Sequence, residues 1–367
     1  MKILSRLVLF ISLSLFVHRI NAQPKSSPGY QINGMISGAA NGTVIQLIDI
    51  DELSIIDSTV VQDGKFSFTG KVEQPKSCWL RAGDAYAILQ IENVNMEFSS
   101  SMARMKFDYS CSGGPEQTLQ TQLNVAVRPF EEIYAPAFDS LYYKKFKDSL
   151  HERRLAKTFN MANDRYMAIF IAFGKTHINS HIGLDIVYRN RKSIAMDSLI
   201  LLYNKLPANL LQTDRARGLK TYTQENLVKK GQQFRDFQAT DINGKTFKLS
   251  SLKGSYVYLI FGSIGCAPCR TENRYIAENY QWLTKHMQIV NFSMDLNKKE
   301  WLAAAKLDGI TWKNISDLEG MAGRIKTLYD VVSMPTSFLI NPSGTVVEKF
   351  VGYSAENFKK IQDIIKQ

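Results

Sequence analysis

The chain has 367 residues, of which 45% are hydrophobic and 22% are charged, and this composition predicts a folded protein with two or three cores and excludes a disordered chain. Its formal net charge is +11, but the basic residues are scattered, so a solvated surface is favoured and no nucleic-acid partner is expected. Four cysteines are too few for a disulfide scaffold in a chain of this length.

Residues 1–22 are typical of a cleaved signal peptide. Lys2 and Arg6 precede an apolar run over 7–17, and Ala22 ends the segment on a small residue. An uncleaved membrane anchor is the alternative, but it needs roughly 20 apolar residues, and polar residues interrupt or end this run. We therefore expect an exported protein of the periplasm or cell envelope.

Residues 30–112 are predicted to form a small all-β domain. Short runs rich in β-forming residues, such as 65–69, alternate with turn signals such as Asp63-Gly64. Over residues 113–228 apolar side chains recur at helical spacing and glycine is scarce. We expect four or five helices there, packed as a connecting region.

Residues 229–367 have the element order of a thioredoxin-like α/β domain. A hairpin is predicted first, and the run over 256–261 is then apolar throughout, as a central strand covered on both faces requires. A helix is predicted to follow over 267–285. The later elements are expected in the order strand, helix, helix, strand, strand and helix, at 289–294, 298–307, 321–329, 336–340, 345–351 and 355–365.

Cys266 and Cys269 lie where the buried strand gives way to this helix. Two residues separate them, so the pair can close a disulfide across one helical turn. Free N–H groups and the helix dipole favour an anion at the first position. We therefore expect Cys266 to attack as a thiolate and Cys269 to resolve the mixed disulfide. Ala267 and Pro268 separate the two cysteines, and proline is well tolerated early in a helix.

A zinc half-site is one alternative for this motif, and an inert disulfide on a thioredoxin scaffold is another. Zinc would need two further ligands, but downstream of the pair there is a single histidine, His286, and no cysteine. His177 and His181 are separated by an expected helix break. We therefore expect no metal and no small-molecule cofactor.

Pro335 stands at the mouth of the strand predicted over 336–340. Proline in that place is ordinarily an edge or turn residue. In thioredoxin folds, however, a cis-proline faces the disulfide at this point of the chain. The two motifs together are far more specific than either one alone.

With these motifs, residues 231–367 resemble the extracytoplasmic thioredoxins of the TlpA and ResA type. The whole chain resembles secreted thioredoxin-like proteins of Bacteroidetes that carry an N-terminal β-domain of unassigned function (DUF4369-like). The resemblance implies that Cys266 is the nucleophile, that the Met334-Pro335 peptide is cis, and that the Met334 backbone pairs with an extended substrate segment. It also implies that the substrate contacts Gly265, Ala267, Pro268 and Met334.

Glu272 matches a glutamate that ResA-type proteins keep near their cysteines, where it could accept or relay a proton. The alternative is an ordinary acid in the first turns of a helix.

Two departures from the family also matter. Gly262 and Gly265 stand where tryptophans are usual, and Ile260 replaces the buried aspartate of cytosolic thioredoxins. We therefore expect an open, flexible rim around the sulfur.

Cys78 and Cys111, in the β-domain, could form a structural disulfide or remain two buried thiols. Export favours the disulfide, which would contribute about 2–4 kcal/mol. A second redox pair is disfavoured because neither cysteine is expected at the start of a helix.

The leading functional hypothesis is a thiol-disulfide oxidoreductase that reduces or exchanges disulfides in periplasmic proteins. By family analogy, its clients could include apocytochrome c, and its electrons would come from a membrane donor of the DsbD/CcdA type. A thiol peroxidase is one alternative, although Leu259 and Ser263 stand where that class has proline and threonine. A cell-envelope binding or assembly protein with an accessory thioredoxin domain is the other.

Overall fold

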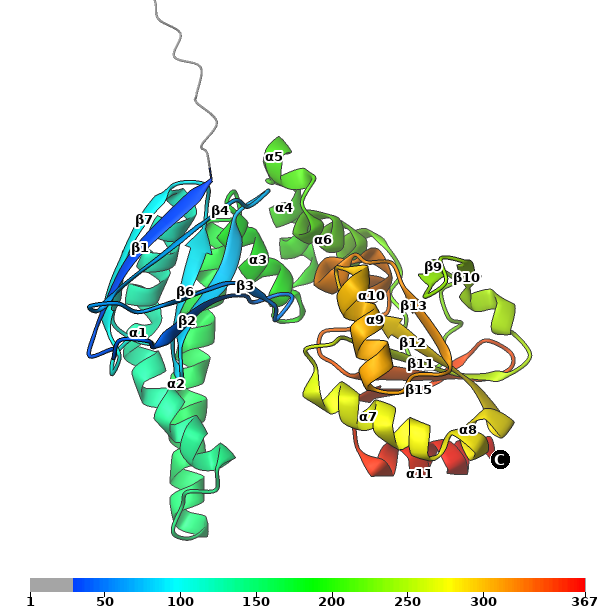
Figure 1. Ribbon diagram of the computed structural model, residues 1–367. Coiled ribbons are helices and arrows are strands. Elements are labelled where there is room, and N and C mark those ends of the chain that lie inside the picture. The colour runs from blue at the N-terminus through cyan, green and yellow to red at the C-terminus, as the bar shows by residue number, and fades with distance from the viewer. Residues whose placement is uncertain (1–28, 367) are drawn as a thin grey trace, which may run out of the picture.

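The computed structural model describes residues 29–366, so the predicted signal peptide lies outside the described residues. An N-terminal all-β unit, a helical middle region and a C-terminal thioredoxin-like unit follow one another along the chain (Figure 1). This is the predicted fold class. Within residues 29–366, no helix is both long and apolar enough to cross a membrane.

The N-terminal unit consists of two four-stranded sheets that enclose an apolar core. Their strand orders are β4-β1-β7-β8 and β3-β2-β5-β6. In β1 buried and exposed positions alternate, as expected for a strand with one face on a core. The strands are β1 (Tyr30–Ser37), β2 (Val44–Asp49), β3 (Ile55–Val60), β4 (Lys65–Gly70), β5 (Lys76–Ala82), β6 (Ala85–Ile91), β7 (Asn95–Ser101) and β8 (Tyr109–Ser112).

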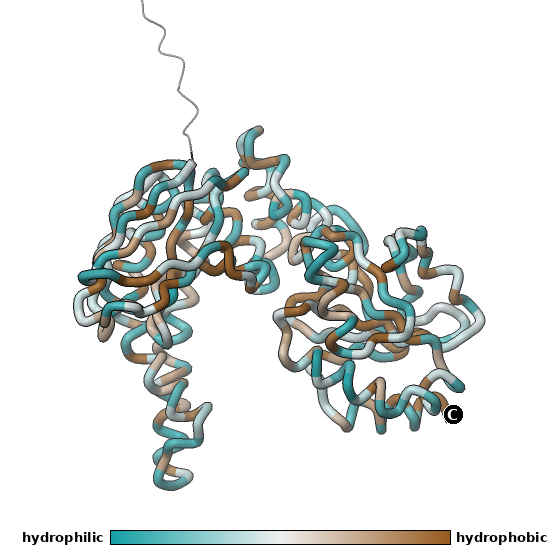
Figure 2. The backbone as a smooth tube through the Cα atoms, viewed as in Figure 1, coloured by the Kyte–Doolittle hydropathy of each residue, from teal (hydrophilic) through white to brown (hydrophobic). Residues whose placement is uncertain are grey.

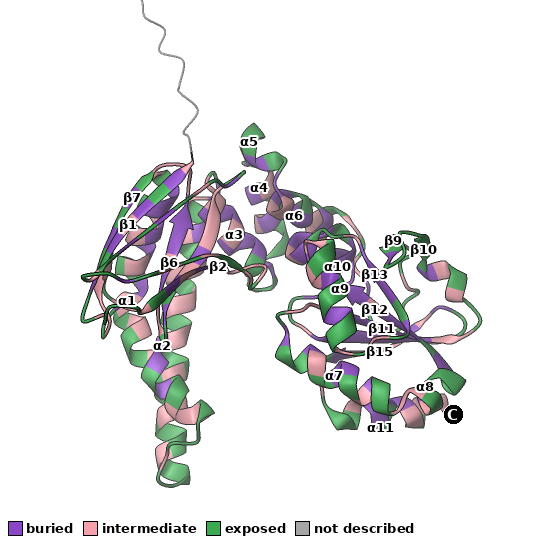
Figure 3. Ribbon diagram, viewed as in Figure 1, coloured by how far each residue is buried: buried purple, intermediate pink, exposed green. Residues whose placement is uncertain are grey.

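The middle region starts with a long helical hairpin and ends with a cluster of shorter helices. The far end of the hairpin projects beyond the sheets and is largely exposed (Figure 3). Asp148 caps the second helix, and Ser180 caps the third after the predicted break. The helices are α1 (Pro115–Tyr142), α2 (Ser149–Thr176), α3 (His181–Arg189), α4 (Met196–Asn204), α5 (Ala208–Leu211) and α6 (Asp214–Gln224), with a 3-10 turn over Arg191–Ser193.

The C-terminal unit is a seven-stranded mixed sheet in the order β10-β9-β13-β12-β11-β14-β15. The central strand β11 pairs in parallel with β12 and antiparallel with β14. The strands are β9 (Gln238–Asp241), β10 (Thr246–Lys248), β11 (Tyr256–Gly262), β12 (Met287–Ser293), β13 (Lys313–Ser316), β14 (Thr336–Ile340) and β15 (Val346–Val351).

Side chains of β11 point alternately into two apolar cores, one on each face of this sheet. Leu259 belongs to the core that also contains residues of α10, whereas Tyr258 belongs to the core formed with α7, α8 and α11. Hydrophobic segments accordingly gather on the inner strands (Figure 2). The helices are α7 (Ala267–Glu278), α8 (Tyr280–His286), α9 (Lys298–Leu307), α10 (Arg324–Leu328) and α11 (Ala355–Ile365), with 3-10 turns over Leu249–Leu252 and Gly320–Ala322.

Three local predictions differ from the structure. The helix predicted over 267–285 is two helices, because the Asn279 side chain donates to the Tyr275 carbonyl oxygen, 2.8 Å away, and ends α7. The helix predicted over 321–329 is shorter and follows a 3-10 turn. Strand β13 was not predicted, since its polar sequence lacks the apolar run of a buried parallel strand.

Candidate active site at the start of α7

The structure brings the two predicted redox motifs to one edge of the C-terminal sheet. Phe261, at the end of β11, pairs with Thr336, at the start of β14. The cysteine motif therefore follows β11 at the same edge at which Pro335 enters β14. The Met334-Pro335 peptide is cis.

Cys266 and Cys269 form a disulfide with Cα atoms 5.3 Å apart. Cys266 is the N-cap of α7, and its Sγ accepts the backbone N–H of Cys269 at 3.2 Å. Pro268 lies in the first turn of that helix. When the disulfide opens, the same N–H and the helix N-terminus are placed to stabilise a thiolate on Cys266. Both cysteines are nevertheless buried, at 7% and 4% exposure.

Glu272 is a buried acid one helical turn beyond Cys269. The Tyr258 hydroxyl donates to its Oε1 at 2.5 Å, and the same hydroxyl lies 2.7 Å from Ser337 Oγ. Oε2 is buried and has no hydrogen-bond partner among the described residues. Burial raises the pKa of Glu272 to about 7, and the Tyr258 hydrogen bond opposes part of that shift. The carboxyl group can therefore exchange a proton near neutral pH.

A small cavity of about 30 Å³ adjoins Cys269 on the inner side. Asn273, Asp295 and Asp308 contribute polar atoms to its lining. A space of this size can hold one water molecule when polar partners surround it. The cavity is therefore large enough to place one water molecule beside Cys269.

Polar contacts fix the segment that leads into Cys266. The Ile264 N–H donates to Asp295 Oδ1 at 2.9 Å, and the Ile264 carbonyl oxygen accepts from Arg270 Nη1 at 3.0 Å. Arg270 also forms an ion pair with Asp308 at 2.9 Å, so part of its positive charge is neutralised. Sequence reasoning missed both aspartates because they follow β12 and α9, far along the chain from the cysteines.

The rim around the sulfur is not open, contrary to the expectation drawn from the two glycines. A Cβ atom on Gly262 would lie 3.2 Å from Cys269 Sγ, so the disulfide itself fills that position. A Cβ atom on Gly265 would lie 2.9 Å from Leu53 Cδ1. The β2–β3 loop of the N-terminal domain therefore covers this side of the site. That side was expected to be open because glycine stands where the family usually has tryptophan.

The expected Cys78–Cys111 disulfide is wrong for this structure, in which both residues are free, buried thiols. Cys78 lies in β5 and Cys111 in β8, which belong to different sheets. Each packs as a small apolar side chain in the shared core. Burial raises the pKa of both thiols, that of Cys111 to about 12, so they remain protonated and unreactive.

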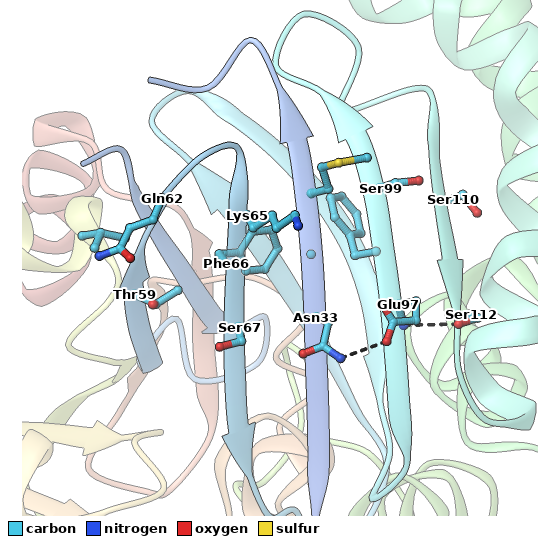
Figure 4. Close-up of a pocket in the computed structure, with 14 residues that line it drawn as sticks. Asn33, Thr59, Gln62, Lys65, Phe66, Ser67, Glu97, Ser99, Ser110 and Ser112 are labelled. Carbon is cyan, nitrogen blue, oxygen red and sulfur yellow. Dashed lines mark hydrogen bonds between the residues drawn. The ribbon is translucent and has the colours of Figure 1, made fainter. Parts of the chain in front are cut away.

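A wide hollow of about 860 Å³ lies on the β4-β1-β7-β8 sheet of the N-terminal unit, and neither Cys266 nor Cys269 lines it. Its lining consists largely of polar side chains (Figure 4), and along β4 and β7 exposed positions alternate with buried ones. Asn33 Nδ2 donates to Glu97 Oε1 at 2.9 Å across this face, and the Glu97 N–H donates to Ser112 Oγ at 3.2 Å. The hollow contains no cysteine and is not part of the redox site.

Two families match separate parts of the chain. Residues 230–349 match the AhpC/TSA family, and residues 30–120 match a domain of unknown function, DUF4369. The thiol-disulfide oxidoreductase ResA of Bacillus subtilis (strain 168) is 32% identical over 131 residues, which cover 35% of this chain and 72% of that protein. ResA of Geobacillus kaustophilus (strain HTA426) is 29% identical over 132 residues, with 36% and 74% covered.

Solved structures also align with part of the chain. The thioredoxin domain of a thiol-disulfide oxidoreductase from Bacteroides vulgatus is 22% identical, with a TM-score of 0.35, and the alignment covers 38% of this chain and 99% of that one. A thiol:disulfide interchange protein from Bacteroides sp. is 23% identical, with a TM-score of 0.34 and coverage of 39% and 93%. The match to ResA, together with the site geometry, shows that the chain belongs to the ResA-like thiol-disulfide oxidoreductases.

Proposed function

We propose that this enzyme is exported and acts on disulfides of other polypeptides through Cys266 and Cys269. The observation that carries the proposal is the placement of this pair at the N-terminus of α7, beside a buried acid and opposite the Met334-Pro335 segment. The proposal also includes the predicted division of the chain into a signal peptide over 1–22, a β-domain over 30–112, a helical connecting region over 113–228 and a thioredoxin-like domain over 229–367.

In the reducing direction, the Cys266 thiolate attacks one sulfur of a substrate disulfide. A mixed disulfide forms, and the other substrate sulfur leaves as a thiolate that takes up a proton. Cys269 then loses its proton and attacks Cys266 Sγ. The second substrate thiolate leaves, and the Cys266–Cys269 disulfide forms, so two electrons have passed to the substrate. In the opposite direction the same steps oxidise a dithiol.

Glu272 is proposed to take the proton of Cys269 during the second step. Its Oε2 is buried without a hydrogen-bond partner among the described residues, and it lies one turn from Cys269 on the same helix. An acid whose pKa lies near the working pH is suited to both accepting and returning a proton. Pro335 would shape the substrate side of the site, with Gly265, Ala267, Pro268 and Met334 as contacts.

The expected partners are protein thiols and disulfides in the periplasm or cell envelope. The oxidised pair needs an external dithiol for each further turnover, and a membrane donor of the DsbD/CcdA type would supply it. The disulfide of oxidised apocytochrome c is one client that fits this direction of electron flow, because its reduction yields the free thiols. The reduction potential of the pair against glutathione would distinguish a reductant from an oxidant.

Trapping of the mixed disulfide tests the proposal directly. A Cys269→Ser variant should accumulate adducts through Cys266, because the resolving sulfur is gone while the nucleophile remains. Non-reducing electrophoresis with mass spectrometry would identify the adducts, and Cys266→Ser is the matched control that should form none. If Cys269→Ser traps nothing and the wild type does not reduce insulin, the proposal is wrong.

A further inference from the structure

Leu53 of the N-terminal domain lies against the residue that precedes Cys266. A Cβ atom on Gly265 would lie 2.9 Å from Cδ1, 3.0 Å from Cβ and 3.4 Å from Cγ of Leu53. Any side chain at Gly265 would therefore displace this leucine. Figure 1 shows the loop between β2 and β3 on the side of the N-terminal domain that faces the start of α7. One wall of the active site is thus supplied by a different unit of the chain.

The loop holds Leu53 in a conformation that leucine rarely adopts. Its φ is +54°, in the left-handed region. The Leu53 N–H donates to the Asp49 carbonyl oxygen at 2.9 Å, and the Asp49 N–H donates to the Ser54 carbonyl oxygen at 2.9 Å. Asp49 Oδ1 also accepts the N–H groups of Asp51 at 2.7 Å and Glu52 at 3.1 Å. The turn is fixed by its own hydrogen bonds, although the leucine at its tip is 43% exposed.

Further contacts link this loop to the other two units. Asp51 Oδ1 accepts hydrogen bonds from Arg189 and Arg215 of the helical region. The Arg215 guanidinium lies 5.4 Å from the centroid of the Tyr188 ring, and the Tyr188 hydroxyl lies 2.8 Å from Thr327 Oγ1 of the C-terminal unit. The position of the loop relative to the cysteines is therefore set by a chain of polar contacts through all three units.

Leu53 lies against Gly265, the residue before Cys266, and Cys266 itself is only 7% exposed. Thiol exchange depends on access to the attacking sulfur. We propose that Leu53 is a specificity-determining residue, which admits sulfur carried on an extended polypeptide segment and excludes disulfides held in folded domains. This inference rests on the disulfide exchange proposed above for the same site.

The side of the site formed by Met334 supports an extended segment as the substrate. Within the described residues, the backbone N–H and C=O of Met334 make no hydrogen bond, so they are free to pair with a substrate backbone. Val332, close by, is 41% exposed and adds apolar surface. A small-molecule disulfide is also narrow enough to enter, but it has no chain to bind there. A folded domain would meet the N-terminal unit before its sulfur reached Cys266.

Cysteine cross-linking tests the geometry without using the enzyme's activity. In the full chain with Cys266→Ser and Cys269→Ser, the pair Leu53→Cys and Gly265→Cys should form a disulfide on mild oxidation. Leu201→Cys with Gly265→Cys is the control, since Leu201 is an exposed leucine on α4, and it should remain uncross-linked. Absence of the first cross-link would overturn the proposal.

Substrate selection is tested by kcat/KM with three probes: an unfolded peptide with one disulfide, oxidised glutathione, and a folded disulfide-bonded protein. The wild type should prefer the peptide. Leu53→Ala and Leu53→Gly should raise the ratio of kcat/KM for the folded protein to kcat/KM for the peptide on the order of tenfold. Leu201→Ala should change none of the three values.

The outcomes separate this proposal from the one on which it rests. Equal changes for all three probes would show that Leu53 only packs against Gly265, and a wild-type preference for glutathione would exclude the polypeptide substrate. Either result overturns the selection by Leu53 but leaves disulfide exchange intact. A wild type that is inert toward every probe would overturn the exchange itself, while the cross-link would still report the geometry.

Discussion

Glu272 combines deep burial with a neutral hydrogen-bond donor, and this combination makes its protonation sensitive to pH. It is 1% exposed, and Tyr258 donates to it. Because its pKa is raised to about 7 from 4.5, the folded protein holds a proton that the unfolded chain releases. Stability should therefore fall as pH rises from about 4.5 to about 7, and the full loss of about 3 kcal/mol should persist above that range.

Replacement of Glu272 by glutamine should remove this part of the pH dependence. The free energy of unfolding of Glu272→Gln, relative to the wild type, should increase by about 3 kcal/mol between about pH 4 and about pH 8. Urea denaturation across this range would measure it. If Glu272 also takes the proton of Cys269, the variant should release the mixed disulfide more slowly. If the stabilities of the wild type and of Glu272→Gln changed with pH in the same way, that result would contradict the raised pKa of Glu272.

Among the elements, the central strand β11 and the start of α7 were predictable from the sequence, whereas the end of α7 and the strand β13, which is separated from β11 by β12, were not. The run over 256–261 is apolar because β11 is covered on both faces. In β13, by contrast, Asn314 is buried and accepts a hydrogen bond from Trp301 Nε1 at 2.9 Å. Only the tertiary structure supplies that partner, so no local pattern distinguishes β13 from a polar loop.

The same limit applies to the active site. Cys266, Cys269 and Pro335 have local signatures, namely the cysteine spacing and a proline before a strand. The contact of Leu53 with Gly265 joins residues from different units, and nothing in the spacing of either sequence segment indicates it. The glycine was visible in the sequence, but its role depends on a side chain more than two hundred positions earlier.

The Asn314–Trp301 hydrogen bond, which joins β13 to α9, should contribute measurably to the stability of the C-terminal unit. Asn314→Ala leaves the buried indole N–H without an acceptor, which should cost about 1–3 kcal/mol. Trp301→Phe in the same background should then cost less than it does alone, because the lost interaction is shared. Urea unfolding of the four proteins in this double-mutant cycle provides the test. Strict additivity would show that the two side chains do not interact.

At the scale of the whole molecule, the helical region and the C-terminal unit share a core centred on Tyr188. The Tyr188 ring packs against Gly218, where a Cβ atom would lie 2.7 Å from it, and the Arg191 guanidinium lies 4.4 Å from the ring centroid. Its hydroxyl donates to the Met321 carbonyl oxygen at 3.2 Å. Ala322 of the C-terminal unit belongs to the same apolar cluster. This junction joins the C-terminal unit to the helical region, which in turn binds the Leu53 loop through Asp51.

Truncation of Tyr188 should therefore separate the units without removing the redox chemistry. Tyr188→Ala should cost about 3–5 kcal/mol, split urea unfolding into two transitions, and increase protease cleavage between α6 and β9. The exposed Tyr142 on α1 provides the control, and Tyr142→Ala should behave as the wild type does. Because the C-terminal sheet keeps its own two cores, exchange with a small disulfide should survive in Tyr188→Ala while discrimination against folded substrates is lost. A variant that unfolds in one transition and keeps that discrimination would show that the units are held together elsewhere.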